Sequence, residues 1–171
     1  MQQMVRPNKT RDLIIRRADA ADAAALVALM QLAHPDGDAT DRDDFAAHAA
    51  SIVLIAELDD QPAGYAVLSP VNDIAKAAHG YLVCDLFITA AAKARSAGKP
   101  LVAACAATAK QDGKTYLRWQ TKAWDVAGQD FAQKLGAVEE PVMDHHLRQR
   151  RFDTLAGEGA AIMAAGAVPC V

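Results

Sequence analysis

The chain has 171 residues, of which 52% are hydrophobic and 23% charged, and these values are ordinary for one globular domain. Its net charge of −3 excludes a global cationic field that would hold a nucleic acid. No apolar run approaches the roughly 20 residues of a membrane span, and residues 1–11 lack the apolar core of a secretory signal. Three sparse cysteines without metal-ligand spacing suggest free thiols, so we expect a cytoplasmic protein.

The first quarter of the chain is expected to form a strand and two helices. An apolar run at residues 13–15 predicts the strand. Apolar residues recur at helical spacing over 25–33 and predict a helix with one apolar stripe, which Asp19 or Asp22 can cap. Residues 41–50 predict a second, short helix.

The next segment predicts strands. Two apolar runs, at 52–55 and 64–68, flank a polar turn and indicate an antiparallel hairpin. Residues 69–80 are expected to form a loop. The run at 81–88 is nearly all apolar, which is typical of a central strand covered on both faces, so we expect Cys84 to be a small core residue.

The rest of the chain continues the alternation of helices and strands. Gly113 and Gly136 can each end a helix, and Asp125 can cap one. The expected elements are a helix at 100–110, a strand at 116–119, a helix between Asp125 and Gly136, a strand at 142–147 and an added helix within 154–171. This order predicts an α/β fold with a mixed sheet, and the absence of a G-x-G-x-x-G turn argues against a dinucleotide fold.

The segment most informative about function is residues 85–100, where a buried strand, an Arg-x-x-Gly loop and a helix start follow one another. Such a junction binds anions, because free backbone N–H groups and the positive end of the helix dipole point at the space over the loop. Gly98 allows close approach of a phosphate, and Arg95 and Lys99 add positive charge. Pro100 suits the first helical turn, where its missing N–H costs little.

The chain resembles the GNAT family of N-acetyltransferases in an ordered series of segments. Asp85-Leu86-Phe87-Ile88 is similar to the family's central strand, and Arg95-Ser96-Ala97-Gly98-Lys99-Pro100 is similar to its pyrophosphate loop. Residues 125–137 resemble the family's last helix motif, and residues 15–23 resemble its first strand and helix. The resemblance implies a mixed sheet with helices on both faces.

The resemblance also implies a division of the chain. It covers residues 12–147 as an acetyltransferase domain. Residues 1–11 are then expected to be a flexible N-terminal segment, and residues 148–171 a C-terminal extension.

The implied reaction is direct attack of an amine on the thioester of acetyl-CoA, with a base taking the amine's proton and a strand amide stabilising the oxyanion. The backbone of Leu86, Phe87 and Ile88 would pair with pantetheine and hold the thioester carbonyl. The loop from Arg95 to Pro100 would hold the pyrophosphate, and Asp125 stands at the family's Asn position. The acceptor is a small-molecule or protein amine, no metal is implied, and a homodimer is compatible with the sequence.

Several side chains could be the base. Asp85 is the candidate we select, and its alternative is a hydrogen-bonded structural carboxylate. Glu57, His48 and His79 are further candidates, although most such residues are solvated bystanders. The pair His145-His146 is not expected to bind a metal, because neighbours on a strand point to opposite faces. An acidic set at 36–44 could attract a cationic amine or could be plain surface.

Two positions depart from the family's pattern. Pro100 replaces the loop's second glycine and removes one N–H, and Ala132 stands where the family has a Tyr that protonates the leaving thiolate. These departures support a second interpretation, a GNAT-like domain that binds acyl-CoA or a protein partner without turnover. A third is an interaction protein that binds no CoA.

Overall fold

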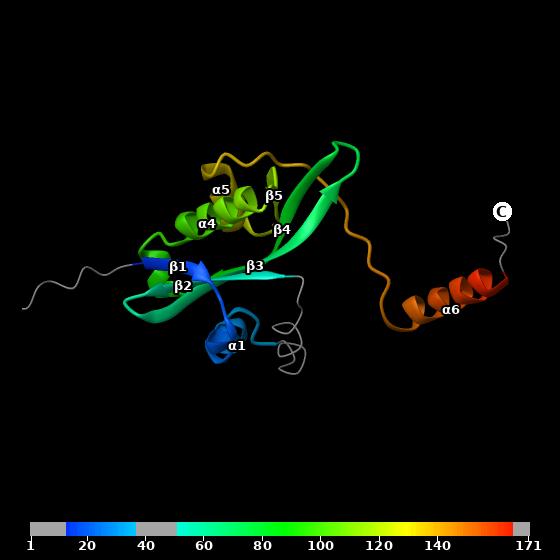
Figure 1. Ribbon diagram of the computed structural model, residues 1–171, viewed down its shortest axis with the longest axis horizontal. Coiled ribbons are helices and arrows are strands. Elements are labelled where there is room, and N and C mark those ends of the chain that lie inside the picture. Colours follow the sequence, from blue (N-terminus) through cyan, green and yellow to red (C-terminus); the bar gives the residue numbers. More distant parts are fainter. Residues whose placement is uncertain (1–12, 37–50, 166–171) are drawn as a thin grey trace, which may run out of the picture. The chain divides into compact units, whose positions relative to one another are not determined.

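The computed structural model describes residues 13–36 and 51–165 (Figure 1). The chain divides into two compact units, with the boundary between Leu135 and Gly136. The predicted helix at 41–50, the candidate His48 and all of the acidic set except Asp36 lie outside the described residues.

Among the described residues, five strands form one sheet in the order β1-β2-β3-β4-β5. Neighbouring strands are antiparallel except for β4 and β5, which are parallel. The strands are β1 (Leu13–Arg17), β2 (Ile52–Leu58), β3 (Gln61–Asp73), β4 (Ala78–Ile88) and β5 (Tyr116–Arg118). The predicted mixed sheet is therefore confirmed, and β5 pairs in parallel with the central strand β4.

The first hairpin confirms the expected polar turn. Asp59 and Asp60 both have positive φ angles, 56° and 64°, which fit a tight two-residue turn whose twist matches the flanking strands. The pairing runs from Leu58 opposite Gln61 to Ile52 opposite Leu68.

The predicted loop at 69–80 is wrong, because most of it extends the next hairpin. β3 continues to Asp73, β4 begins at Ala78, and Val71 lies opposite Gly80. The segment is polar, yet its side chains alternate between half-buried and exposed along β3, as in a strand with one covered face. Cross-strand pairing outweighed the composition that had indicated a loop.

Helices cover both faces of the sheet, as expected (Figure 1). The short 3₁₀ helix η1 (Ala20–Asp22) leads into α1 (Ala23–Ala33), whose buried stripe packs on one face. The α1 side buries Leu26, Leu29, Met30, Ile55, Tyr65 and Val67 together. Alternate residues of β2 and β3 point to the other face, under the helix α4 (Gly98–Gln111). That side buries Leu54, Ala56, Ala66, Leu68, Tyr81, Val83, Leu101, Cys105 and Ala109.

The helix ends follow the predicted signals closely. α4 begins at Gly98, two residues before the predicted Pro100, and Gly113 beyond its end has a φ of +70°. Asp125 caps α5 (Val126–Lys134), because its Oδ1 accepts from the Gly128 amide at 3.0 Å.

In the described part of the second unit, residues 136–165, there is one helix, α6 (Gln149–Ala165). The strand predicted at 142–147 is wrong, since residues 137–148 have no regular structure. Their apolar side chains, including Val142 and Met143, are exposed. A strand needs a neighbouring strand for its backbone hydrogen bonds, and none of the described residues supplies one here. No helix in the described part of the chain is long and apolar enough to span a membrane.

Candidate functional site

The strand β4 has different surroundings in its two halves. Gly80, Tyr81 and Leu82 pair with β3 on one side and with β5 on the other. Pairing with β5 stops at Leu82, and within the described residues only β3 pairs with residues 83–88. One backbone edge of this second half therefore presents polar groups that an extended ligand can pair with, as a further strand would.

A β-bulge lies where the two halves meet. Leu68 lies opposite Val83 and Val67 opposite Asp85, so Cys84 is the extra residue. Cys84 is exposed, which corrects the expectation that it belongs to the core. The bulge shifts the alternation of side chains, and β-bulges commonly re-aim side chains beside active sites.

The re-aimed side chain of Asp85 belongs to a polar cluster. Its Oδ2 accepts from the Tyr65 hydroxyl at 2.5 Å and lies 2.7 Å from Nε2 of His34. Tyr65 is fully buried in the sheet under α1, and the carboxylate of Asp85 is 27% exposed. His34 follows the last residue of α1, and its side chain is 54% exposed. The structure thus gives the predicted Asp85 two hydrogen-bonding partners.

Sequence reasoning missed both partners of Asp85. His34 is 51 residues away and Tyr65 is 20 residues away, so no local spacing links the three. The hairpin register was the one available signal, because it places Tyr65 opposite Phe87, two residues from Asp85. For His34 there was only its position at the end of a predicted helix.

The predicted anion-binding loop contains a short helix, α3 (Ala90–Ala94), and a turn before α4. The amides of residues 95–97 donate to carbonyls of α3, and the Leu101 amide donates to the Ala97 carbonyl. Within the described residues, the amides of Gly98 and Lys99 have no backbone acceptor. Pro100 has no amide hydrogen, so the start of α4 offers two N–H groups to an anion.

Gly98 is buried at the start of α4. A Cβ on this residue would lie 3.3 Å from the Phe131 ring and 3.4 Å from Cδ1 of Ile88. The glycine lets α4 approach α5 and β4 closely. A substitution at 98 would therefore disturb packing, whatever the loop binds.

The loop carries positive charge in a chain whose net charge is negative. Lys93, Arg95 and Lys99 are all exposed around the start of α4. The sequence has no Asp or Glu from residue 86 to residue 111. Three cations next to free helix amides make a local anion-attracting surface.

The remaining predicted residues have local partners. The carboxylate of Asp125 is engaged with the start of α5, and Ala132 is half-buried on that helix. Of the alternative bases, Glu57 accepts from Arg16 at 2.5 Å, and Nδ1 of His79 lies 2.8 Å from Oδ1 of Asn72. In residues 13–36 and 51–165, no group of three or more His, Cys, Asp or Glu side chains could hold a metal ion.

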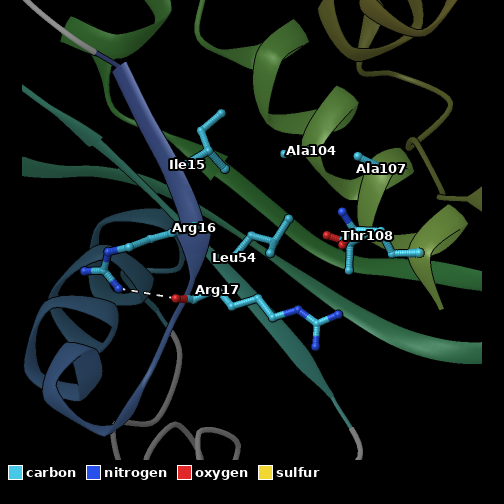
Figure 2. A pocket seen from close by; sticks show the side chains of 8 residues that line it. Ile15, Arg16, Arg17, Leu54, Ala104, Ala107 and Thr108 are labelled. Atoms are coloured by element: carbon cyan, nitrogen blue, oxygen red, sulfur yellow. Dashed lines mark hydrogen bonds between the residues drawn. The ribbon is translucent and has the colours of Figure 1, made fainter.

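A separate open pocket of about 350 Å³ lies between β1, β2 and α4 (Figure 2). It is lined by Ile15, Arg16, Arg17, Leu54, Ala104, Ala107, Thr108 and Gln111. None of these residues was predicted to bind cofactor or substrate, and none belongs to the open half of β4. The pocket is distinct from the candidate site.

A family model described as the acetyltransferase (GNAT) family matches residues 23–137. No curated protein matches the chain in sequence.

Three solved structures illustrate the similarity of fold. A ribosomal-protein-alanine N-acetyltransferase from Brucella melitensis biovar Abortus 2308 has a TM-score of 0.69 at 14% identity, over 80% of this chain and 99% of that one. An aminoglycoside acetyltransferase from an uncultured soil metagenomic sample, in complex with sisomicin, has a TM-score of 0.67 at 18% identity, over 80% and 97%. The aminoglycoside N-acetyltransferase AAC(6')-Iy in complex with CoA has a TM-score of 0.70 at 19% identity, over 84% and 98%.

Proposed function

Because the chain belongs to the GNAT family of acetyltransferases, we propose that it transfers the acetyl group of acetyl-CoA to an amine by direct attack on the thioester. The observation that carries the proposal is the open half of β4 followed by a positively charged helix start. An extended, amide-containing chain that ends in a pyrophosphate matches this succession of backbone edge and anion site.

The backbone of Leu86, Phe87 and Ile88 would pair with the pantetheine chain and hold the thioester carbonyl. The loop from Arg95 to Pro100 would hold the pyrophosphate through the amides at the start of α4 and through its cationic side chains. Asp125 would contact the cofactor near the start of α5. Acetyl-CoA supplies the activated acetyl group, and the residues of this chain orient it and exclude water.

The transfer forms a bond from the amine nitrogen to the acetyl carbon and breaks the bond from that carbon to sulfur. CoA leaves as a thiolate, and the amine loses a proton to a base near the site. A thiol has a reference pKa of about 8.5, so the thiolate can leave without a strong acid. This is why Ala132 in place of a Tyr is compatible with turnover.

The acceptor class proposed here is a primary amine on a small molecule or on a protein. The similar structures include an aminoglycoside acetyltransferase in complex with sisomicin and a ribosomal-protein-alanine N-acetyltransferase, and their acceptors are amines of these two kinds. We place the protein in the cytoplasm, where the free thiols of Cys84 and Cys105 stay reduced. A homodimer remains compatible with the proposal.

A second candidate function is binding of acyl-CoA without turnover. Pro100 and Ala132 favour it, since one removes a phosphate-binding amide and the other a hydroxyl. Release of CoA thiol in the presence of an amine panel separates the two candidates, because only the transferase releases thiol in proportion to the amine acetylated.

Thermal stabilisation by acetyl-CoA tests the cofactor site. A ligand that binds only the folded chain stabilises it by RT ln(1 + [L]/Kd), about 2.7 kcal/mol at a hundredfold excess over Kd. Lys99→Glu should reduce the shift strongly, because it places a carboxylate beside the proposed pyrophosphate. Lys110→Glu is the matched control, since both lysines are exposed on α4 but lie at opposite ends.

Arg95→Ala should weaken binding less than Lys99→Glu, because it removes a charge without adding an opposing one. Wild type that is not stabilised at millimolar acetyl-CoA would overturn the proposed function. Equal shifts for Lys99→Glu and Lys110→Glu would place the cofactor elsewhere.

Ala132→Tyr tests the route of thiolate protonation. A hydroxyl near the leaving sulfur should raise turnover or leave it unchanged. Steady-state CoA release measures it, with the Tm of the variant as the control for folding. A clear loss of turnover in a folded variant would mean that position 132 does not face the thioester.

A further inference from the structure

The structure brings His34 from the end of α1 onto the carboxylate that the sequence selects as a base. Nε2 of His34 lies 2.7 Å from Oδ2 of Asp85, and the Tyr65 hydroxyl donates to the same oxygen at 2.5 Å. We propose that His34 is the catalytic group that accepts the amine's proton and that Asp85 is a positioning residue. This inference rests on the proposed acetyl transfer.

The geometry favours the imidazole over the carboxylate as the group that meets the amine. Oδ2 of Asp85 already has two hydrogen-bonding neighbours, and this side chain is 27% exposed. The His34 side chain is 54% exposed, twice the exposed fraction of Asp85. An amine approaching from solvent on the α1 side of the sheet would therefore reach His34 before Asp85.

The placement also fits the proposed donor site. Phe87 packs with the buried residues under α1, whereas Leu86 and Ile88 pack with those under α4. Asp85, bonded to Tyr65 and His34, lies on the α1 side. A thioester held along the open edge of β4 would have the cationic start of α4 at the end where the pyrophosphate lies. The proton acceptor would lie on the face of the sheet that α1 covers.

In the proton step, the attacking nitrogen forms its bond to the acetyl carbon and passes its proton to the imidazole of His34, while the bond from that carbon to sulfur breaks and CoA leaves as the thiolate. Nε2 carries a hydrogen that it donates to Asp85, which fixes the tautomer and stabilises the imidazolium that forms. The Tyr65 hydroxyl holds the carboxylate in place from the buried side.

Chemical rescue tests this assignment in the full-length protein. His34→Ala removes the imidazole, and free imidazole in the assay can take its place at this exposed position. The probe amines are sisomicin, a dipeptide with a free α-amine and a peptide with one lysine, and the one that wild type acetylates fastest is used. His34→Ala should lower kcat by about 10²-fold or more. Added imidazole should raise the kcat of this variant by at least about tenfold. The acetyl-CoA thermal shift should stay at the wild-type value.

The pH of the assay gives a second readout that a structural role would not move. An alkylamine with a reference pKa of about 10.4 is about a hundredfold more often neutral at pH 9 than at pH 7. The defect of His34→Ala should therefore shrink at pH 9, because the solvent then supplies a neutral amine. His79→Ala is the matched control, since His79 is also exposed and hydrogen-bonded to one side chain, Asn72.

Asp85→Asn should lower kcat while leaving the acceptor KM close to wild type, and imidazole should not rescue it. The inference alone is overturned if wild type is active and His34→Ala stays within about threefold of it. It is also overturned if the defect neither shrinks at pH 9 nor responds to imidazole. Wild type that binds acetyl-CoA but acetylates none of the three amines overturns the inference together with turnover, and wild type that does not bind acetyl-CoA overturns the proposed function itself.

Discussion

Two polar clusters hold the two ends of the same helix, α1, and they differ in how open they are. The N-terminal cluster contains Arg16, Asp22 and Glu57, and the C-terminal cluster contains His34, Tyr65 and Asp85. Both join the helix region to strands of the sheet through charged hydrogen bonds. Only the second lies beside the open half of β4.

The N-terminal cluster is the more closed of the two around its central carboxylate, because Asp22 is 10% exposed, although Arg16 is 39% exposed and Glu57 22%. Arg16 donates to both oxygens of Asp22, at 2.6 and 2.7 Å, and to Glu57 at 2.5 Å. The side chain of Asp22 is 10% exposed and also accepts from the Asp19 amide. These bonds, with Arg16 the largest cause, lower the pKa of Asp22 to about 2 and raise that of Arg16.

In the C-terminal cluster a carboxylate is again hydrogen-bonded to a nitrogen-containing side chain, but more than half of that side chain, His34, is exposed. A carboxylate clamped by a guanidinium away from solvent contributes to stability and is unavailable to a substrate. A carboxylate that orients an exposed imidazole can transmit its effect to a bound amine. The comparison therefore predicts that breaking the first cluster changes stability, whereas breaking the second changes turnover.

Removing the apolar contact between the two clusters should have the largest effect, because it loosens α1 at both ends. Leu29 is 3% exposed in the buried stripe of α1, and Leu29→Ala should lower the free energy of unfolding by about 2–5 kcal/mol. Leu32→Ala on the same helix is the control, since Leu32 is 65% exposed. Denaturant unfolding measures both, and equal losses would contradict the packing of α1 described here.

Arg16→Met should have the second-largest effect on stability, because it removes the cation of the N-terminal cluster. It leaves two neighbouring carboxylates without their shared cation, so the Tm should fall. Arg17→Met is a matched control at the next residue, because the ion pair of Arg17 with Asp112, at 3.0 Å, is more exposed. A Tm of Arg16→Met no lower than that of Arg17→Met would show that the closed cluster contributes little to stability.

The change of stability with pH should show the contribution of Asp22 in the same cluster, and this effect should be smaller than that of Arg16→Met. The pKa of Asp22 is about 2 in the folded chain, below its ordinary value of 3.8, so folding favours its ionised form. Its contribution is complete above pH 3.8 and is lost as the pH falls towards 2. Asp22→Asn should therefore lose less stability over this range than wild type does. Tm measured as a function of pH checks this, with Asp130→Asn at an exposed position as the matched control.

Tyr65→Phe should have the smallest effect on stability. It tests whether the C-terminal cluster serves turnover rather than stability. It keeps the buried ring and removes only the hydrogen bond to Asp85, which is worth about 1 kcal/mol. If the open cluster serves turnover, kcat should fall while Tm changes little. A variant with unchanged kcat and a Tm loss as large as that of Arg16→Met would reverse the roles given to the clusters.

Much of the fold could be predicted because it follows from local patterns. The apolar stripe of α1, the hairpin over β2 and β3, and the cap at Asp125 each need only a few neighbouring residues. The wrong predictions concern segments whose structure depends on a partner strand. Most of residues 69–80 forms strands because the two polar segments pair with each other. Residues 142–147 form no strand because the described residues offer them no partner strand.

The sequence by itself determined the order of the elements, the face that each helix buries and the cationic segment from Arg95 to Lys99, because periodicity and charge are local properties. The tertiary structure decided three other features. These are the bulge at Cys84, the end of the β4–β5 pairing at Leu82 and the meeting of His34 with Asp85. Each depends on contacts between segments distant in the sequence, up to the 51 residues that separate His34 from Asp85. Register is a property of two strands together, since a shift of one residue would turn Asp85 to the other face of the sheet.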